Sequence, residues 1–291
     1  MAVKSRFREE PWPRVAVLQL PGVNCEYETK RTLERAELEA EIVRWNEPAD
    51  RLEAFDAYVI PGGFSYQDRI RAGAVAAKVP ALDVVARGAE AGKPVLGLCN
   101  GAQVLVEAGL VPGTRPGVVE MALASNRGGW SGYYCNWVTV RVHKTGAETA
   151  FTSRFEDGEL FPVPLAHGEG CFTVRDRDRF REWMDAGQVP LRYVTPGGDA
   201  DPPFPHNPNG SLFGAAGVTN PAGNVLAFMP HPERGAFLRQ VPDRIEGPWG
   251  DRRREAARHR ERLDGAGPGF RIFQSLSDFL RWGADAKGER K

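Results

Sequence analysis

The sequence predicts an α/β fold, a three-layer αβα sandwich around an open and mostly parallel sheet, on three observations. Short apolar runs alternate with helix-forming stretches at the spacing of parallel strands joined by right-handed crossovers. Glycine-rich turns follow the apolar runs directly, as Pro61-Gly62-Gly63 does. The 291 residues are 42% hydrophobic and 26% charged, as in globular proteins that bury a large core.

The first half of the chain accounts for the parallel strands. We expect strands over Arg14–Leu20, Ala40–Trp45 and Ala57–Ile60 and from Pro94 into Cys99, with helices over Glu26–Ala36 and Ala81–Ala91. Catalytic groups in such sheets gather at the carboxyl ends of strands. Gly62-Gly63 and Cys99 both lie at such ends.

The second half of the chain shows a less regular alternation of strands and helices. The alternation in Trp137–Val142 predicts a half-exposed strand, Gly197–Gly210 a loop, Val225–Met229 a buried strand, and Phe270–Trp282 a closing helix. Residues 251–262 carry six arginines and three acidic residues, which favours a solvated helix face, with a docking surface as the alternative. We expect one domain over 1–291, with an N-terminal extension at 1–13 and a charged insert at 247–269.

Composition excludes several classes of protein. The net charge is +0, which favours neither nucleic acid nor an anionic membrane surface as a partner. No apolar stretch approaches the roughly 20 residues that span a bilayer, and no secretory signal opens the chain. Four cysteines without a CxxC motif predict neither a disulfide framework nor a zinc site, so we expect a cytoplasmic protein with no metal site.

The stretch Gly97–Gln103 (GLCNGAQ) is the most informative in the chain. A buried strand stops at Cys99, which has glycines two residues away on either side, and a helix-forming stretch follows. This is the layout of a nucleophile elbow with sulfur in place of a hydroxyl. At a helix N-terminus the dipole favours the thiolate, the reactive form of cysteine. The alternative is a buried cysteine in an ordinary α/β turn.

A base for this thiol is predicted at His231. Like Cys99 it follows a buried strand, so both residues emerge at one edge of the sheet. Glu233 lies two residues further on, from where its carboxylate can orient the imidazole. Cys99, His231 and Glu233 therefore form a candidate catalytic triad, against the alternative of a surface turn at Pro232.

Acyl chemistry also needs donors for an oxyanion. The backbone N–H of Asn100 is one candidate, and the N–H of Gly63 at the end of the neighbouring strand is the other. A tight turn would explain Gly63 equally well.

His167-Gly168-Glu169-Gly170 contains a rival His/Glu pair. We rank it below His231, because its pairing with Cys99 requires an unsupported topology. His143, His206 and His259 are expected to be bystanders, and Cys25, Cys135 and Cys171 unpaired core or subsurface thiols. The chain has no phosphate-binding glycine motif.

Several stretches together resemble a known family. They are PGVNC at 21–25, PGGFSY at 61–66, the Cys99 elbow, AHGEG at 166–170, NPNGS at 207–211 and MPHPER at 229–234. The chain resembles the class I (triad) glutamine amidotransferases, and among them the glutaminase subunits of phosphoribosylformylglycinamidine synthase. The family usually has Gly where this chain has Gln67, so the resemblance does not extend to that loop position.

The resemblance implies a flavodoxin-like sheet and a mechanism. Cys99 would attack the side-chain amide of glutamine and form a thioester, and Gln103 would contact this substrate. Ammonia would pass to a large synthetase subunit, which holds ATP and Mg²⁺ and amidinates formylglycinamide ribonucleotide; this chain would bind no cofactor. A small third subunit is usual. The alternatives are a stand-alone thiol hydrolase, such as a peptidase or γ-glutamyl hydrolase, and a redox-sensing module, against which the complete triad argues.

Overall fold

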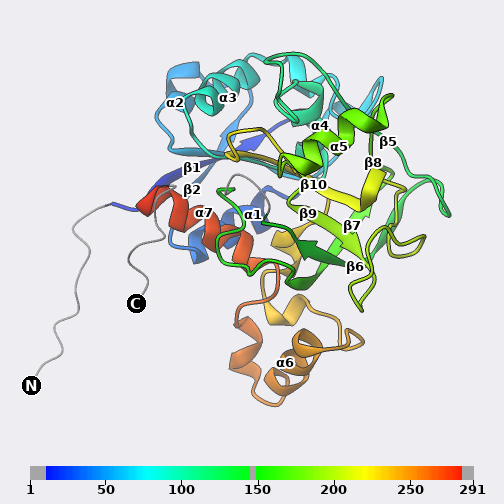
Figure 1. Ribbon diagram of the computed structural model, residues 1–291. Helices are drawn as coiled ribbons and strands as arrows, with labels where there is room; N and C mark the ends of the chain where they lie inside the picture. Colours follow the sequence, from blue (N-terminus) through cyan, green and yellow to red (C-terminus); the bar gives the residue numbers. More distant parts are fainter. Residues whose placement is uncertain (1–10, 145–148, 284–291) are drawn as a thin grey trace, which may run out of the picture.

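A nine-stranded sheet forms the centre of the computed structural model, which describes residues 11–144 and 149–283 (Figure 1). Residues 1–10 of the expected N-terminal extension lie outside the described residues. The strands are β1 (Arg14–Gln19), β2 (Glu39–Arg44), β3 (Ala57–Ile60), β4 (Val95–Leu98), β5 (Ala122–Ser125), β6 (Tyr134–Val142), β7 (Leu160–His167), β8 (Glu169–Thr173), β9 (Leu191–Val194), β10 (Ala215–Thr219) and β11 (Val225–Phe228). The helices are α1 (Glu26–Arg35), α2 (Ala49–Glu53), α3 (Pro80–Glu90), α4 (Asn100–Glu107), α5 (Arg177–Asp185), α6 (Pro248–Ala256) and α7 (Phe270–Trp282).

The strand order of the large sheet is β2-β1-β3-β4-β11-β10-β9-β6-β7. Neighbours are parallel from β2 to β11 and antiparallel from β11 to β7. The α/β fold and the parallel first half are confirmed, and the antiparallel strands extend the sheet on one side. The strands β5 and β8 form a separate antiparallel pair.

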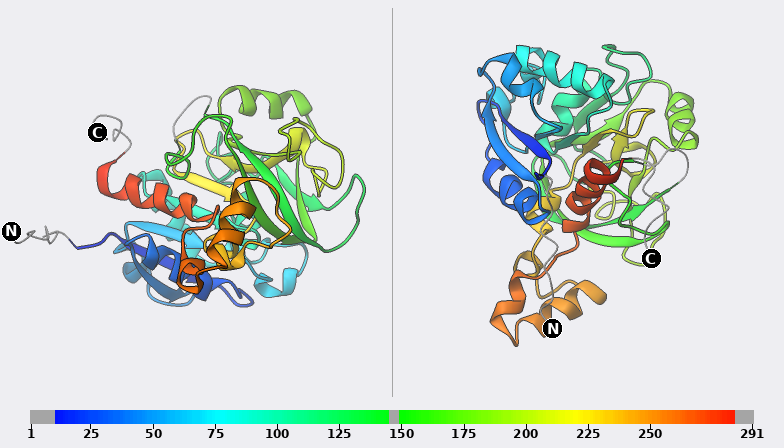
Figure 2. Two further views of the ribbon diagram at one scale, coloured as in Figure 1. Left: turned by 90° about the horizontal axis from the view of Figure 1, so that it is seen from below. Right: turned by 90° about the vertical axis from the view of Figure 1, so that its left-hand side faces the viewer.

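Helices cover both faces of the sheet, which gives the three expected layers (Figures 1 and 2). The alternation along β1 shows how: Ala16 and Leu18 face a core shared with α2, α3, α4 and α5, whereas Val15 and Val17 face a core shared with α1 and α7. All four side chains are fully buried. A strand that is apolar on both faces can lie only inside such a sandwich.

The charged insert forms a small helical arm around α6 that projects from one side of the body (Figure 2). Most of the α6 side chains are exposed, as the solvated-face interpretation predicts. The closing helix α7 has the expected bounds, and β6 alternates between buried and more exposed residues along Val138–Val142. No helix in the described part of the chain is long and apolar enough to cross a membrane. The single-domain organisation stays a prediction.

Candidate active site

Cys99 occupies a sharp turn between β4 and α4. It is the N-cap residue of α4 and has φ 49° and ψ −105°, a strained conformation for a residue with a side chain. The glycines around it are needed for close packing: a Cβ at Gly101 would lie 1.9 Å from the carbonyl oxygen of Ile60, and one at Gly97 would lie 2.5 Å from that of Gly101. The backbone therefore has the geometry that a nucleophile elbow requires.

His231 and Glu233 leave the sheet beside this elbow. The strand β11 is the parallel neighbour of β4, with Phe228 opposite Leu98, and the chain then turns into the 3₁₀ helix η4 (Pro232–Gly235). The Nδ1 atom of His231 lies 2.6 Å from Oε1 of Glu233. The two residues are 2% and 0% exposed, so the structure brings the predicted base and its orienting acid together in the interior.

The charge on His231 follows from its neighbours. Burial by itself lowers the pKa of this imidazole, but the carboxylate of Glu233 and then the thiol of Cys99 raise it, and hydrogen bonds to Cys25 and Cys99 act in the same direction. The net result is a pKa well above the ordinary 6.5. The imidazolium form is favoured, which suits a counterion for a thiolate at Cys99.

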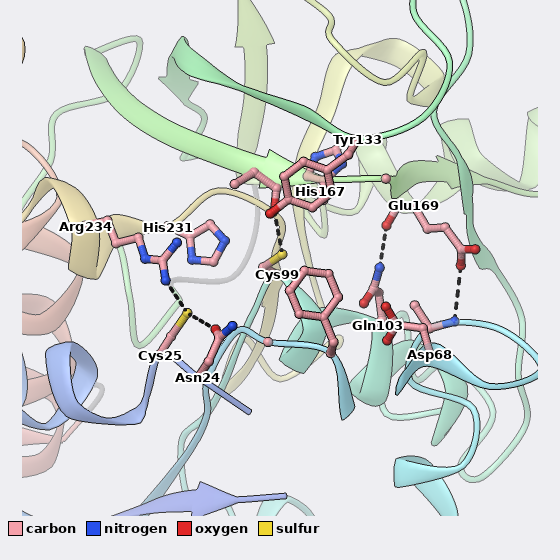
Figure 3. A pocket seen from close by; sticks show the side chains of 15 residues that line it. Asn24, Cys25, Asp68, Cys99, Gln103, Tyr133, His167, Glu169, His231 and Arg234 are labelled. Carbon is pink, nitrogen blue, oxygen red and sulfur yellow. Dashed lines mark hydrogen bonds between the residues drawn. The ribbon is translucent and has the colours of Figure 1, made fainter. Parts of the chain in front are cut away.

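A cavity of about 200 Å³ opens in front of Cys99 and His231 (Figure 3). Residues from six segments of the chain line it: Asn24, Cys25, Gly63, Phe64, Asp68, Ala72, Cys99, Gln103, Tyr133, Ala166, His167, Gly168, Glu169, His231 and Arg234. The rings of Phe64 and Tyr133 stack with their centroids 6.1 Å apart, and both are about half exposed, so they stand at its mouth. The cavity suits a small molecule better than an extended peptide.

The two backbone groups predicted to bind an oxyanion are the N–H groups of Asn100 and Gly63. Asn100 is the first residue of α4, so its N–H has no partner within the helix. Phe64 N–H donates to Gly22 O at 2.9 Å and Ser65 N–H to Asn100 Oδ1 at 3.0 Å. In the described part of the chain, no acceptor takes the N–H of Gly63. The Ser65–Asn100 bond holds the Gly63 loop against the elbow.

The wall of the cavity opposite the Cys99 thiol carries the carboxylates of Asp68 and Glu169. The side-chain amide of Asn100 donates to Gln103 Oε1 at 2.9 Å, and Gln103 donates to the backbone oxygen of Glu169. Burial raises the pKa of Asp68 to about 6, and the charge of Glu169 adds to this. Over residues 11–144 and 149–283 neither carboxylate pairs with a lysine or arginine. The two carboxylates therefore have no basic side chain among the described residues to neutralise them.

His167 requires a correction to the sequence interpretation. The topology does bring it to the cavity, because the Sγ of Cys99 lies 3.4 Å from the carbonyl oxygen of the preceding Ala166. The ring, however, is held by Asn126 Oδ1 at 3.0 Å from Nδ1 and by Asn209 Nδ2 at 3.4 Å from Nε2. Burial lowers its pKa to about 3, and His231 adds to this, so His167 is a neutral side chain with both nitrogens occupied.

Cys25 is a buried, unpaired thiol, as expected, but the sequence interpretation gave it no place in the cavity. It is buried, but it lines the cavity and contacts Arg234, whose Nη2 lies 3.0 Å from Sγ. Burial raises its pKa, and a hydrogen bond to His231 opposes this. Gly62 makes room for both, since a Cβ there would lie 2.6 Å from Cε1 of His231 and 3.1 Å from Sγ of Cys25.

The remaining histidines and thiols lie elsewhere. His143, His206 and His259 do not line the cavity. Of the other free cysteines, Cys171 is buried as expected, whereas the expectation for Cys135 was wrong, because it lies in the exposed first part of β6. Sequence reasoning missed Asn24, Cys25, Asp68, Tyr133 and Arg234 as lining residues. The turn Pro21–Cys25 follows β1 and lies at the same edge of the sheet as Cys99, and this position after a parallel strand is the signal that could have identified Cys25.

Comparison with known proteins places these residues in context. The family model for CobB/CobQ-like glutamine amidotransferase domains matches residues 12–280. The chain is 41% identical over 273 residues to phosphoribosylformylglycinamidine synthase subunit PurQ of Methanothrix thermoacetophila, covering 92% of this chain and 98% of that one. It is 44% identical over 223 residues to the PurQ subunit of Symbiobacterium thermophilum, covering 76% and 87%. Its fold matches a chain in the structure of PurLQS from Thermotoga maritima, with a TM-score of 0.67, 33% identity and coverage of 92% and 99%.

Proposed function

Because this chain belongs to the CobB/CobQ-like glutamine amidotransferases and, within them, to the PurQ glutaminase subunits of phosphoribosylformylglycinamidine synthase, we propose that its cavity hydrolyses L-glutamine through a thioester at Cys99. One observation carries this proposal: the thiol at the elbow shares a small cavity with a buried imidazole that a carboxylate holds at 2.6 Å.

In the first half of the reaction, the Cys99 thiolate attacks the carboxamide carbon of glutamine. The negative charge that develops on the carboxamide oxygen is met by the N–H groups of Gly63 and Asn100. The imidazolium of His231 gives its proton to the departing nitrogen, the C–N bond breaks, and ammonia leaves a thioester at Cys99.

In the second half, water attacks the thioester carbon. His231, now neutral, takes a proton from the water, and the C–S bond breaks to release glutamate and regenerate the thiolate–imidazolium pair. Glu233 keeps the Nδ1 proton in place throughout, so that Nε2 is the nitrogen that exchanges protons with the reacting groups.

The carboxylates of Asp68 and Glu169 support the choice of substrate. Glutamine carries an α-ammonium group at the end of the molecule remote from its carboxamide. A cation placed between two unpaired carboxylates relieves their mutual repulsion and gains charge-assisted hydrogen bonds. Gln103, bonded to both Asn100 and Glu169, would hold the same end of the substrate. A peptide substrate of a stand-alone hydrolase has no such free ammonium at this position.

The ammonia is proposed to be delivered to a large synthetase subunit, with a small third subunit in the same complex. The synthetase would bind ATP, Mg²⁺ and formylglycinamide ribonucleotide, and this chain would bind no nucleotide, in keeping with its lack of a phosphate-binding glycine motif. A cytoplasmic location fits the four free cysteines.

The decisive experiment replaces the thiol in the assembled complex. We expect Cys99→Ala to abolish amidine formation from glutamine and to leave synthesis from added ammonium chloride intact. Cys135→Ala, which removes an exposed thiol outside the cavity, is the matched control and should support both reactions. Loss of both reactions in the Cys99 variant would mean that the thiol is structural, and retention of both would end the proposal.

A further inference from the structure

The proposed mechanism leaves one buried thiol of the cavity unused. Cys25 is 1% exposed and caps the N-terminus of α1, which brings its Sγ beside His231 (Figure 3). Its Sγ donates to Asn24 Oδ1 at 3.2 Å and accepts from Arg234 Nη2 at 3.0 Å. The imidazole of His231 therefore lines the same cavity as two thiols, Cys99 and Cys25.

Cys25, His231 and Glu233 place three side chains of kinds that can bind a metal ion close together. One sulfur, one nitrogen and one carboxylate oxygen from the three residues all lie within 4.8 Å of one another, and all three residues are buried. A second observation also indicates a ligand. Glu233 is 0% exposed, and its Oε2 atom has no hydrogen-bond partner in the described structure. An unpaired carboxylate oxygen in the interior is costly unless something binds it.

We propose that Cys25, His231 and Glu233 form an inhibitory binding site for a soft divalent metal ion such as Zn²⁺. One thiolate, one imidazole and one carboxylate are ligands that zinc combines in proteins, with a water from the cavity as the fourth. Cys99 is not a ligand in this arrangement. The inhibitory consequence rests on the proposed glutaminase function, whereas the metal site itself does not.

The charges of the site balance around such an ion. Binding displaces the proton of the Cys25 thiol and the Nδ1 proton of His231. The thiolate and the Glu233 carboxylate then neutralise the two positive charges of the metal. The neighbouring Arg234 is itself paired with Glu28 at 3.1 Å, so it adds no uncompensated positive charge.

The geometry needs one small adjustment. Zinc bonds of about 2.0–2.3 Å place ligand atoms about 3.2–3.8 Å apart around a tetrahedral ion. Nδ1 of His231 and Oε1 of Glu233 are 2.6 Å apart, so the carboxylate would move back by about 1 Å or turn its free oxygen toward the metal. Either movement takes Glu233 off the imidazole, and the base then loses the partner that orients it.

The first experiment tests the site without relying on activity. Co²⁺ is titrated into full-length Cys99→Ala protein, and the near-ultraviolet band of thiolate-to-cobalt charge transfer is recorded. We expect one equivalent to bind with this band in Cys99→Ala and in Cys135→Ala, and no band in Cys25→Ser. A band that is lost in Cys99→Ala but kept in Cys25→Ser would place the metal on the catalytic thiol and overturn the proposal, as would the absence of a band in all three.

A second measurement covers the case in which Cys25→Ser does not fold. Zn²⁺ should slow alkylation of Cys25 by iodoacetamide in the Cys99→Ala protein, as read by peptide mapping, while Cys135 reacts at an unchanged rate. Equal rates at Cys25 with and without Zn²⁺ would contradict the proposal.

The inhibitory role is tested with glutamine in the assembled complex. Each variant is compared with its own metal-free rate, and the Zn²⁺ concentration for half-inhibition should rise by at least about 100-fold in Cys25→Ser, because a full ligand is lost. Equal sensitivity of wild type and Cys25→Ser, alongside a cobalt band that depends on Cys25, would show that the site exists but does not inhibit. If the proposed glutaminase function is itself wrong, the cobalt and alkylation results are unaffected.

Discussion

His231 and Glu233 form a fully buried pair, with Nδ1 of the imidazole 2.6 Å from Oε1 of the carboxylate. The pair is only two residues apart in the sequence, and η4 bends the chain so that both side chains turn into the same interior site. Because the carboxylate occupies Nδ1, Nε2 is left for the thiol and the substrate. The buried negative charge is also a principal reason that the imidazolium form of His231 is favoured.

Glu233→Gln should lower kcat of the glutaminase reaction by about 10²–10⁴-fold with a smaller change in KM, because the amide neither stabilises an imidazolium nor fixes the tautomer as a carboxylate does. Steady-state kinetics in the complex measure this. Glu255→Gln, on the exposed arm helix α6, is the matched control and should behave as wild type. An unchanged kcat in Glu233→Gln would remove Glu233 from the mechanism.

Asp68→Asn should raise KM for glutamine by about 10–100-fold, the equivalent of one hydrogen bond to a charged group. The raised pKa of Asp68, about 6, adds a pH dependence: this carboxyl becomes protonated as the pH falls through 6, so wild-type KM should rise below that pH while the KM of Asp68→Asn stays flat. 4-Carbamoylbutanoate, which is glutamine without its α-amino group, should be discriminated against by wild type and much less by Asp68→Asn. Equal discrimination by both would argue that the ammonium binds elsewhere.

His167 should make the protein less stable in acid. Its folded-state pKa of about 3 lies below the ordinary 6.5, so the folded state favours the neutral ring, and the stabilisation is present above pH 6.5 and lost as the pH falls toward 3. Between pH 6.5 and 5 the loss amounts to about 2 kcal/mol of unfolding free energy. Urea unfolding at pH 7 and at pH 5 measures the loss of unfolding free energy, and this loss should be smaller in His167→Gln than in wild type. The same drop in both proteins would contradict the assignment.

Gly101→Ala should cost more than about 3 kcal/mol of stability, or prevent folding, because its Cβ would lie 1.9 Å from the carbonyl oxygen of Ile60. Gly197→Ala is the matched control, since its Cβ would find its nearest neighbour, Thr195 Oγ1, at 3.7 Å. Thermal unfolding compares the two. A wild-type melting temperature for Gly101→Ala would mean that the elbow is less tightly packed against β3 than the structure indicates.

Gln67→Gly should stabilise the protein by up to about 1 kcal/mol relative to Gln67→Ala. Gln67 has φ 61°, between Tyr66 at 53° and Asp68 at 53°, so three consecutive residues with side chains adopt a left-handed backbone. Both variants lose the contact from Arg69 to the Gln67 side chain, and the comparison isolates the backbone. Equal stability in urea unfolding would show that the conformation carries no strain.

The parallel half of the sheet and the Cys99 elbow could be predicted from the sequence because both depend on residues that are close together in the chain. Apolar runs that end in Pro61-Gly62-Gly63 and in Cys99 determine strands and their ends within a few residues, and parallel strands end at a common edge. The short spacing of His231 and Glu233 likewise limits how far apart the two side chains can lie. Such features are set by a few neighbouring residues, so they can be predicted without knowing how the rest of the chain folds.

What only the tertiary structure decided depends on residues far apart in the sequence. The antiparallel order β10-β9-β6-β7 brings His167 and Glu169 to the cavity, and no local pattern encodes that order. Cys25 meets His231 and Arg234 across more than 200 residues because β1 and β11 end at the same edge of one sheet. The physical reason is that side-chain charge and contact are set by burial among distant neighbours, which makes His167 neutral, His231 charged and Cys25 a partner of the imidazole.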